Sequence, residues 1–461
     1  MRRTDRAGNT ILGLTLVAAM LLTGCGTKGE EAAETAAPEQ TQQETAEQEE
    51  AAGQEEAAQQ ETAENAEAEQ ETESVPADEE QEATDKMQEA ENTMIESYEM
   101  PDSDAITLVR DMKIGWNLGN TLDASSDNNR SDELSYESLW CGIKTTKEMI
   151  DAVKNAGFRT VRIPVSWHNH VTEDGSYTIS QVWMDRVQEI VDYAIEDDMY
   201  VILNIHHDNN ENYIFPDEAH MEQSKAYISA VWEQIADRFA SYDEHLIMEG
   251  MNEPRLVGTS HEWWLDLNSQ DCVQAVECIN EFNQTFVDTV RASGGNNAER
   301  YLLVPGYAAS LQGATNEYFR LPEDPSGLEN RIMVEVHAYT PYGFALAGSG
   351  DNGYTEQWSM DSDADRAEID GLMDQLYELY VKNGTGVVID EFGAREKNGN
   401  LQARADFSTY YIGAARARGI SCCVWDNNAF SGDGENFGLL FRPMCTFRYP
   451  EIIEGLMRYA D

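Results

Sequence analysis

The chain has 461 residues and a formal net charge of −55 at pH 7. This excess of acidic side chains argues against nucleic acid or an anionic membrane as a partner, and it fits an uncharged substrate better than a polyanionic one. The length allows one large domain with additional segments.

The first 25 residues are typical of a bacterial export signal. Three arginines within the first six residues precede an apolar run, residues 11–22, which is too short to span a bilayer. The run ends in Leu22-Thr23-Gly24-Cys25, which resembles a lipobox, the motif whose cysteine is lipidated and becomes the new N-terminus. An ordinary signal peptide with an incidental cysteine is the alternative. We expect a lipoprotein anchored through Cys25 at the extracellular face of the cell membrane, with the lipid as its only membrane contact.

Residues 26–100 form a low-complexity tract of Glu, Ala, Gln and Thr, with almost no aromatic or β-branched apolar residues. Such a composition cannot bury enough surface to offset chain entropy, so we expect a disordered acidic linker. Like charges extend a linker of this kind. We expect it to hold the remaining domain, residues 101–461, clear of the membrane.

Strand-like apolar runs alternate with amphipathic helical segments from about residue 105 onward. Strands are predicted at residues 113–116, 160–167, 200–206, 245–251, 301–305, 331–339, 386–390 and 420–425. Helices are predicted at residues 146–155, 180–197, 222–241, 272–292, 364–382, 402–417 and 451–459. Repeated βα units in one domain predict an α/β fold, the (β/α)₈ TIM barrel. An open doubly wound sheet would need a glycine-rich phosphate turn after the first strand, and residues 116–123 (WNLGNTLD) do not contain one.

Polar and aromatic side chains gather at the C-terminal ends of the predicted strands, where a barrel of this type carries its chemistry. Glu253 follows the fourth strand and Glu391 follows the seventh. The other members of this set are Arg162, Trp167, His168, His206, His207, Asp208, Asn252, His337, Tyr339, Trp425 and Asp426. Each would cost desolvation energy in an ordinary soluble barrel unless it were paired. Two carboxylates at the ends of these strands are the minimum set of groups needed to cleave a glycosidic bond.

The two-residue alternation of a strand refines these positions. If Glu391 points into the barrel, Asp390 points toward the helices and is expected to be structural. The same rule puts Glu335, His337 and Tyr339 on one inward face, with Glu335 deepest.

Two features of the sequence allow other interpretations. Glu249 has the same parity as Glu253 one strand repeat lower, which makes it either a buried partner for Arg162 or a competitor for the assignment. The run His206-His207-Asp208 suggests a metal site, but neighbours on a strand diverge and no H-E-x-x-H or third-ligand pattern accompanies it. No metal is expected.

Seven short motifs follow one another at the expected strand ends. They are WNLGNT at 116–121, VRIPVSW at 161–167, NIHH at 204–207, NEP at 252–254, HAY at 337–339, IDEFG at 389–393 and VWD at 424–426. Together they resemble glycoside hydrolase family 5, a family of retaining barrel glycosidases, across almost the whole domain from about residue 105. The NEP motif alone is a weak signal, whereas all seven in the family's order make a specific one. The opening motif is most similar to the bacterial endoglucanase and xyloglucanase branch.

The resemblance implies different roles for the two glutamates. Glu253 would be the general acid/base, and Glu391 would be the nucleophile that forms a glycosyl-enzyme intermediate. Arg162 and Tyr339 would hydrogen-bond Glu391 and keep it ionised, while Asn252 would bind the sugar 2-hydroxyl. His206 and His337 would position sugar hydroxyls and the acid/base, and Trp425 would supply an apolar platform for a sugar ring. Further candidates for sugar contacts, of second rank, are His207, Trp167, Asn117 and Trp116.

We therefore expect an endo-acting, retaining β-1,4-glucanase that hydrolyses cellulose-like, mixed-linkage or xyloglucan chains as a monomer. No cofactor and no nucleic-acid partner are implied. A β-mannanase of the same family is an alternative, because specificity resides in loops and subsites rather than in the catalytic pair. A non-catalytic surface glycan-binding lipoprotein is another, although the presence of both glutamates and their partners argues against it. Trp263 and Trp264 fit exposed sugar platforms and helix packing equally well.

Overall fold

The computed structural model describes residues 95–128, 130–432 and 434–460. The predicted export signal, the lipobox with Cys25 and the linker up to residue 94 lie outside these residues. Within the described part of the chain, no helix combines the length and apolarity needed to cross a membrane. The lipid anchor and the linker up to residue 94 therefore stay predictions. The predicted end of the linker at residue 100 is wrong, because Ile95, Tyr98 and Met100 pack against the core of the domain and the Tyr98 hydroxyl donates to Asp374.

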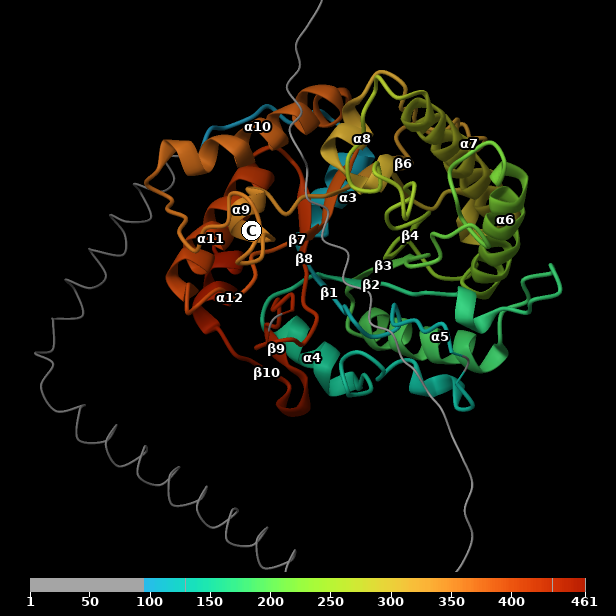
Figure 1. Ribbon diagram of the computed structural model, residues 1–461, viewed down its shortest axis with the longest axis horizontal. Coiled ribbons are helices and arrows are strands. Elements are labelled where there is room, and N and C mark those ends of the chain that lie inside the picture. The colour runs from blue at the N-terminus through green and yellow to red at the C-terminus, as the bar shows by residue number, and fades with distance from the viewer. Residues whose placement is uncertain (1–94, 129, 433, 461) are drawn as a thin grey trace, which may run out of the picture. The chain divides into compact units, whose positions relative to one another are not determined.

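Eight parallel strands close into a barrel in chain order, with β8 paired to β1 (Figure 1). The strands are β1 Ile114–Asn117, β2 Thr160–Ile163, β3 Tyr200–Asn204, β4 Leu246–Glu249, β5 Leu302–Pro305, β6 Ile332–His337, β7 Val387–Phe392 and β8 Ser421–Val424. Each coincides with one of the eight predicted strands. The predicted (β/α)₈ barrel is confirmed.

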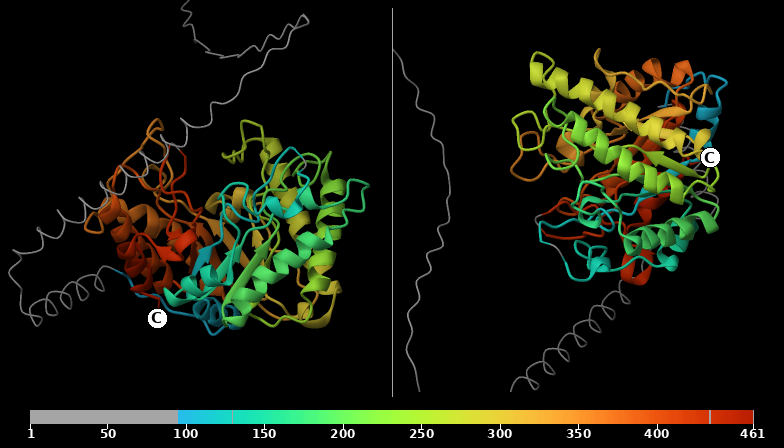
Figure 2. Two further views of the ribbon diagram at one scale, coloured as in Figure 1. Left: turned by 90° about the horizontal axis from the view of Figure 1, so that it is seen from below. Right: turned by 90° about the vertical axis from the view of Figure 1, so that its right-hand side faces the viewer.

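The long helices surround the ring of strands on its outer side (Figure 1). They are α4 Lys147–Asn155, α5 Gln181–Glu196, α6 Met221–Arg238, α7 Gln270–Ala292, α10 Asp363–Leu379, α11 Leu401–Ala417 and α12 Pro450–Met457. Helices α6 and α7 pack side by side along one flank of the barrel (Figure 2). Each helix begins and ends within three residues of its predicted position, because its buried apolar stripe follows the helical period that the sequence displays.

Several shorter elements were not predicted. They are α3 Asp104–Asp111, α8 Leu311–Thr315, α9 Tyr342–Ala345, the antiparallel pair β9 Leu440–Phe441 and β10 Thr446–Phe447, and the 3₁₀ turns Glu133–Ser135, His168–His170, Gly295–Ala298, Tyr307–Ala309, Val381–Asn383 and Arg442–Met444. Helix α3 matters most for the fold. Its Ala105, Leu108 and Val109 belong to the same buried apolar cluster as the inward-facing strand residues Ile247 and Val388. It therefore packs against the interior side chains of the barrel.

The interior of the barrel changes from apolar to charged along the strands. Ile202, Ile247, Leu303, Met333 and Val388 form the apolar layer with α3. Two residues further along their strands lie Asn204, Glu249, Glu335 and Asp390, all fully buried, and Arg162 reaches the same level from β2. This charged layer lies next to the C-terminal ends of the strands.

The prediction that Asp390 faces the helices is wrong. Val388 points into the barrel, so Asp390 points inward as well, and its carboxylate lies 3.6 Å from Nε of Arg162. The register of β7 shifts against both of its neighbouring strands near this point. Such irregularities re-aim side chains locally, and Glu391 consequently also reaches Arg162.

Candidate active site

Glu253 and Glu391 approach each other at the C-terminal end of the barrel. Glu253 lies in the loop after β4 and Glu391 lies within β7. One carboxylate oxygen of Glu253 lies within 4.8 Å of one carboxylate oxygen of Glu391. Their side chains are 17% and 8% exposed, so both remain within reach of a ligand. The separation fits a retaining glycosidase, which needs about 5–5.5 Å, and not an inverting one, which needs about 6.5–9.5 Å.

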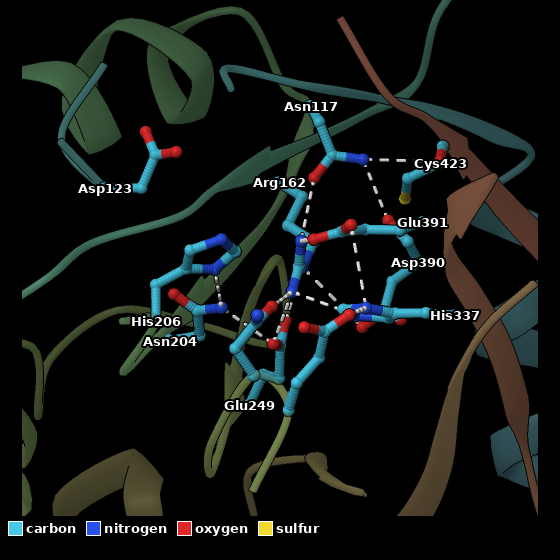
Figure 3. A network of polar contacts seen from close by, with 12 residues as sticks. Asn117, Asp123, Arg162, Asn204, His206, Glu249, His337, Asp390, Glu391 and Cys423 are labelled. Atoms are coloured by element: carbon cyan, nitrogen blue, oxygen red, sulfur yellow. Dashed lines mark hydrogen bonds and ion pairs between the residues drawn. The ribbon is translucent and has the colours of Figure 1, made fainter. Parts of the chain in front are cut away.

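Arg162 lies at the centre of the polar network beneath this pair (Figure 3). Its Nη1 donates a hydrogen bond of 2.6 Å to Glu391, and its Nε and Nη2 donate two bonds of 2.6 Å to Glu249. Further donors reach Asn252 at 2.7 Å and Asn117 at 3.0 Å. Burial lowers the pKa of this guanidinium, but the surrounding carboxylates outweigh it and raise the pKa well above its ordinary value. Of the two alternatives for Glu249, the structure shows the buried partner of Arg162.

Each oxygen of Glu391 accepts a hydrogen bond. Arg162 holds Oε1, and the hydroxyl of Tyr339 donates to Oε2 at 3.0 Å. Burial and the charge of Glu391 raise the pKa of Tyr339 well above its usual range, so the phenol keeps its proton and stays a donor. The two donors fix the orientation of the Glu391 carboxylate.

The partners of Glu253 are different. His337 Nδ1 lies 2.8 Å from Oε1 of Glu253, and Arg255 Nη1 lies 3.4 Å from Oε2. Burial raises the pKa of the Glu253 carboxyl, but the hydrogen bond and charge of His337, with the charge of Arg255, outweigh it and lower the pKa to about 2. For His337, burial lowers the pKa while the charges of Glu391 and Glu253 raise it to about 9. In this state the imidazole carries the proton of the pair.

Several predicted sugar-contacting residues border the two glutamates. Arg162 occupies Oδ1 of Asn252, which leaves the amide hydrogens for a ligand. The ring of His206 is parallel to that of Trp425 at a centroid distance of 6.0 Å, and it contacts the ring of His207 edge-on at 4.4 Å. Burial lowers the pKa of His206 well below its ordinary value and that of His207 to about 4, so both rings are neutral at pH 7.

Three predicted site residues do not reach the ligand side of the network. Trp116 and Trp167 are fully buried, and their indole N–H groups donate to Asp426 and to the backbone of Asn204. Asn117 is also fully buried, where it accepts from Arg162 and donates to the backbone carbonyl of Asp390. The predicted sugar contact of Asn117 is therefore corrected to a positioning role, because its side chain holds β7 and Arg162 from inside the barrel.

Other residues of the site were missed in the sequence. Arg255 contacts Glu253 and lies 3.8 Å above the ring of Trp263. Trp140 is 44% exposed and contacts the ring of His207 at 5.5 Å. The NEP motif is followed directly by Arg255, which was a usable signal, whereas nothing in the sequence near Trp140 connects it with His207. Trp263 is 63% exposed and thus fits a platform better than helix packing.

Three groups of side chains among the described residues have atoms close enough to share a metal ion: Asp123, His206 and His207; Glu249, His337 and Asp390; and Glu253, His337 and Glu391. The carboxylates of the last two groups already face Arg162 or His337. In the first group Asp123 accepts the backbone N–H groups of Asn120 and Thr121. The carboxylates of all three groups thus already have partners within the protein.

Comparisons with known proteins agree on one family. Residues 122–431 match the family described as Cellulase (glycosyl hydrolase family 5). The chain is 42% identical over 379 residues to Endoglucanase 1 of Ruminococcus albus, covering 81% of this chain and 86% of that protein. It is 43% identical over 363 residues to Cellulase/esterase CelE of Acetivibrio thermocellus, which covers 78% of this chain but only 41% of that longer protein.

A solved structure is similar over the same region. It is a GH5 family lichenase from Caldicellulosiruptor sp. F32, with 55% sequence identity and a TM-score of 0.79, and the match covers 80% of this chain and 98% of that one.

Proposed function

Since the chain belongs to glycoside hydrolase family 5, and is thus a glycoside hydrolase, we propose that it hydrolyses internal β-1,4-glucosidic bonds with retention of configuration. One observation carries the proposal. A carboxylate oxygen of Glu253 lies within 4.8 Å of one of Glu391, and the two groups have different partners. A separation of this size leaves room for direct attack on the sugar but not for an intervening water.

Glu391 acts as the nucleophile in the first step. Its carboxylate forms a bond to the anomeric carbon while the bond from that carbon to the leaving oxygen breaks, and the leaving oxygen takes a proton from Glu253. Arg162 and Tyr339 hold the attacking carboxylate, so it does not have to reorganise during the reaction. The amide of Asn252 donates to the sugar 2-hydroxyl, where a hydrogen bond strengthens as positive charge develops on the ring.

His337 supplies the proton that Glu253 needs. In the free state the imidazole holds this proton 2.8 Å from the Glu253 carboxylate. A glucan chain that covers Glu253 removes the remaining water from it, which favours the neutral form of the carboxyl. The proton then passes from Nδ1 of His337 to Glu253 and on to the leaving oxygen.

The second step returns the enzyme to its starting state. Ionised Glu253 removes a proton from a water molecule, the water oxygen attacks the anomeric carbon, and the bond to Glu391 breaks. Glu253 then passes this proton to Nδ1 of His337, which restores the charged pair of the free enzyme. Two displacements at one carbon restore the original β configuration.

Azide tests the two roles separately. With an activated aryl glucoside, Glu391→Ala should be rescued by azide to give the inverted α-glycosyl azide, because azide takes the place of the missing nucleophile. Glu253→Ala should still form the glycosyl-enzyme and give the β-glycosyl azide. The opposite pair of products would exchange the two roles.

We further propose soluble or mixed-linkage β-glucans as the preferred substrates. The endoglucanase name of one relative and the lichenase title of the similar structure support this choice. Exposed Trp140, Trp263 and Trp264 offer apolar faces of the kind that stack on sugar rings. Reducing-sugar release and viscosity should be followed side by side on lichenan, carboxymethylcellulose, xyloglucan and mannan.

Endo action predicts that viscosity falls well before much reducing sugar appears. Activity on mannan alone would favour the β-mannanase alternative. A folded protein that releases nothing from any of the four would favour a glycan-binding protein.

We also propose that the mature chain is held at the cell surface by a lipid on Cys25, a residue outside the described part. The apolar run and the lipobox-like ending support this. Labelled palmitate should enter the full chain expressed in a bacterial host and should not enter the Cys25→Ser variant. Equal labelling of both would overturn the anchor.

A further inference from the structure

Glu335 on β6 and Asp390 on β7 form a carboxyl pair inside the charged layer. Both residues are 0% exposed, and none of their four carboxylate oxygens has a hydrogen-bond donor among the described residues. Their side chains nevertheless lie within hydrogen-bonding reach of each other. Glu335 and Asp390 thus face each other as acceptors with no hydrogen between them.

An ionised carboxylate only accepts hydrogen bonds, so two ionised groups in this position would repel each other and leave buried acceptors unsatisfied. The nearest cations do not solve this. Nε of Arg162 lies 3.6 Å and Nε2 of His337 lies 3.5 Å from Asp390, and both cations already hold other carboxylates. Glu249 adds a third negative charge to the layer. One proton placed between the pair would turn repulsion into a hydrogen bond.

We propose that Glu335 and Asp390 share a single proton and that the pair, with one negative charge, positions His337 and Arg162 for the reaction. The shared proton follows from the buried pair itself, whereas its consequence for catalysis rests on the proposed function.

The other groups of the layer are consistent with a proton at this place. Burial, followed by the charges of Glu249 and Asp390, raises the pKa of Glu335 well above its ordinary value. Burial and Glu249 raise the pKa of Asp390 to about 7. Cys423 on β8 faces the same layer, and burial and Asp390 raise the pKa of its thiol well above the ordinary value, so it adds no charge.

The pair extends the catalytic network into the barrel. His337 lies between Glu253 on its Nδ1 side and Asp390 on its Nε2 side. A single charge on the pair supports the protonated imidazole from below. If the shared proton were lost, a second charge would compete with Glu391 for Arg162 and with Glu253 for His337. Glu335 and Asp390 are therefore positioning residues for both glutamates.

Infrared spectroscopy of the full chain tests the shared proton directly. At pH 8 ordinary carboxyl groups are ionised, so a C=O band of a protonated carboxyl reports a buried acid. We expect this band in the parent protein and in the exposed control variant Glu173→Gln, and we expect its loss in Glu335→Gln. Absence of the band from the parent protein at pH 8, or its persistence in Glu335→Gln, would overturn the proposal. If Glu335→Gln does not fold, the same infrared comparison of Asp390→Asn with the parent protein tests whether the pair shares a proton.

The pH profile of kcat/KM separates positioning from mere structure. Glu335→Gln keeps a donor for Asp390 and the same net charge, so it should retain at least about tenfold more activity than Glu335→Leu, which leaves Asp390 unsatisfied. In Glu335→Gln the alkaline limb of the pH profile should stay at the same pH or move to higher pH. Asp390→Asn leaves the negative charge of the pair on Glu335, which forms no ion pair with His337, so the alkaline limb of this variant should move to lower pH. Equal shifts in both variants would refute the positioning role.

A protein that shows the infrared band but hydrolyses no polysaccharide would refute the proposed function and leave the shared proton intact.

Discussion

His337 is expected to determine where the catalytic proton resides in the free enzyme. His337→Gln keeps a side chain of similar size that can still donate a hydrogen bond to Glu253, but it removes the positive charge. The pair of His337 and Glu253 holds one proton with a pKa of about 9 on the imidazole. In the variant only Glu253 can hold that proton.

The structure allows the size of the change to be worked out. Burial is the largest influence on Glu253, and His337 provides the strongest opposing ones. Without His337 the pKa of Glu253 should rise from about 2 to at least about its ordinary 4.5, which is about 2.5 units or about 3.4 kcal/mol at 1.36 kcal/mol per unit. The group that limits activity at high pH then titrates near 5 instead of near 9, so the alkaline limb should move down by about 3 to 4 pH units.

The assay is kcat/KM on a soluble β-glucan between pH 4 and 10, because this parameter reports the ionisations of the free enzyme. At pH 7 a group with a pKa near 5 is only about 1% protonated, so His337→Gln should lose about 100-fold relative to its own optimum. His245→Gln is the matched control, since His245 precedes β4 at the other end of the barrel and pairs with Asp243. An unchanged alkaline limb in His337→Gln would refute the assignment of the proton to this pair.

Three further outcomes are expected. Tyr339→Phe removes one hydrogen bond to the Glu391 carboxylate. Such a bond is worth about 1.5–3 kcal/mol, so kcat/KM should fall by about 10- to 150-fold while the circular dichroism stays unchanged. A loss under twofold would contradict the role of this hydrogen bond. Arg162→Met leaves Glu249 buried without its cation, which should lower the free energy of unfolding by about 3–5 kcal/mol. The midpoint of thermal unfolding should therefore fall by about 5 °C. An unchanged midpoint would show that the ion pair contributes nothing to stability. Dialysis against EDTA should leave activity intact because side chains supply both the nucleophile and the proton, and a loss restored by one divalent cation would show otherwise.

Much of the fold could be predicted because periodicity in the sequence reports burial directly. The apolar runs of the strands and the stripes of helices such as α5 and α7 placed every long element of the barrel within a few residues. Helix α3 was missed because it follows the acidic tract and its apolar residues find their partners only inside the closed barrel. A local sequence pattern cannot indicate packing partners that come together only when the sheet closes.

The site divides in a similar way. Glu253, Glu391, Arg162 and Tyr339 could be named from motifs at strand ends, since a parallel barrel brings those ends together whatever the loops between them do. Strand alternation failed for Asp390, because register shifts on both sides of β7 turn two successive acids toward Arg162.

The barrel, the family and the two acids at strand ends could all be predicted from the amino-acid sequence, because they depend on patterns that run along the chain. The distance of under 4.8 Å between their oxygens, the raised pKa of His337 and the pairing of Asp390 with Glu335 became visible only in the folded barrel. Distances and proton positions depend on burial and on charges contributed by separate strands. Those charges come together only when the sheet closes.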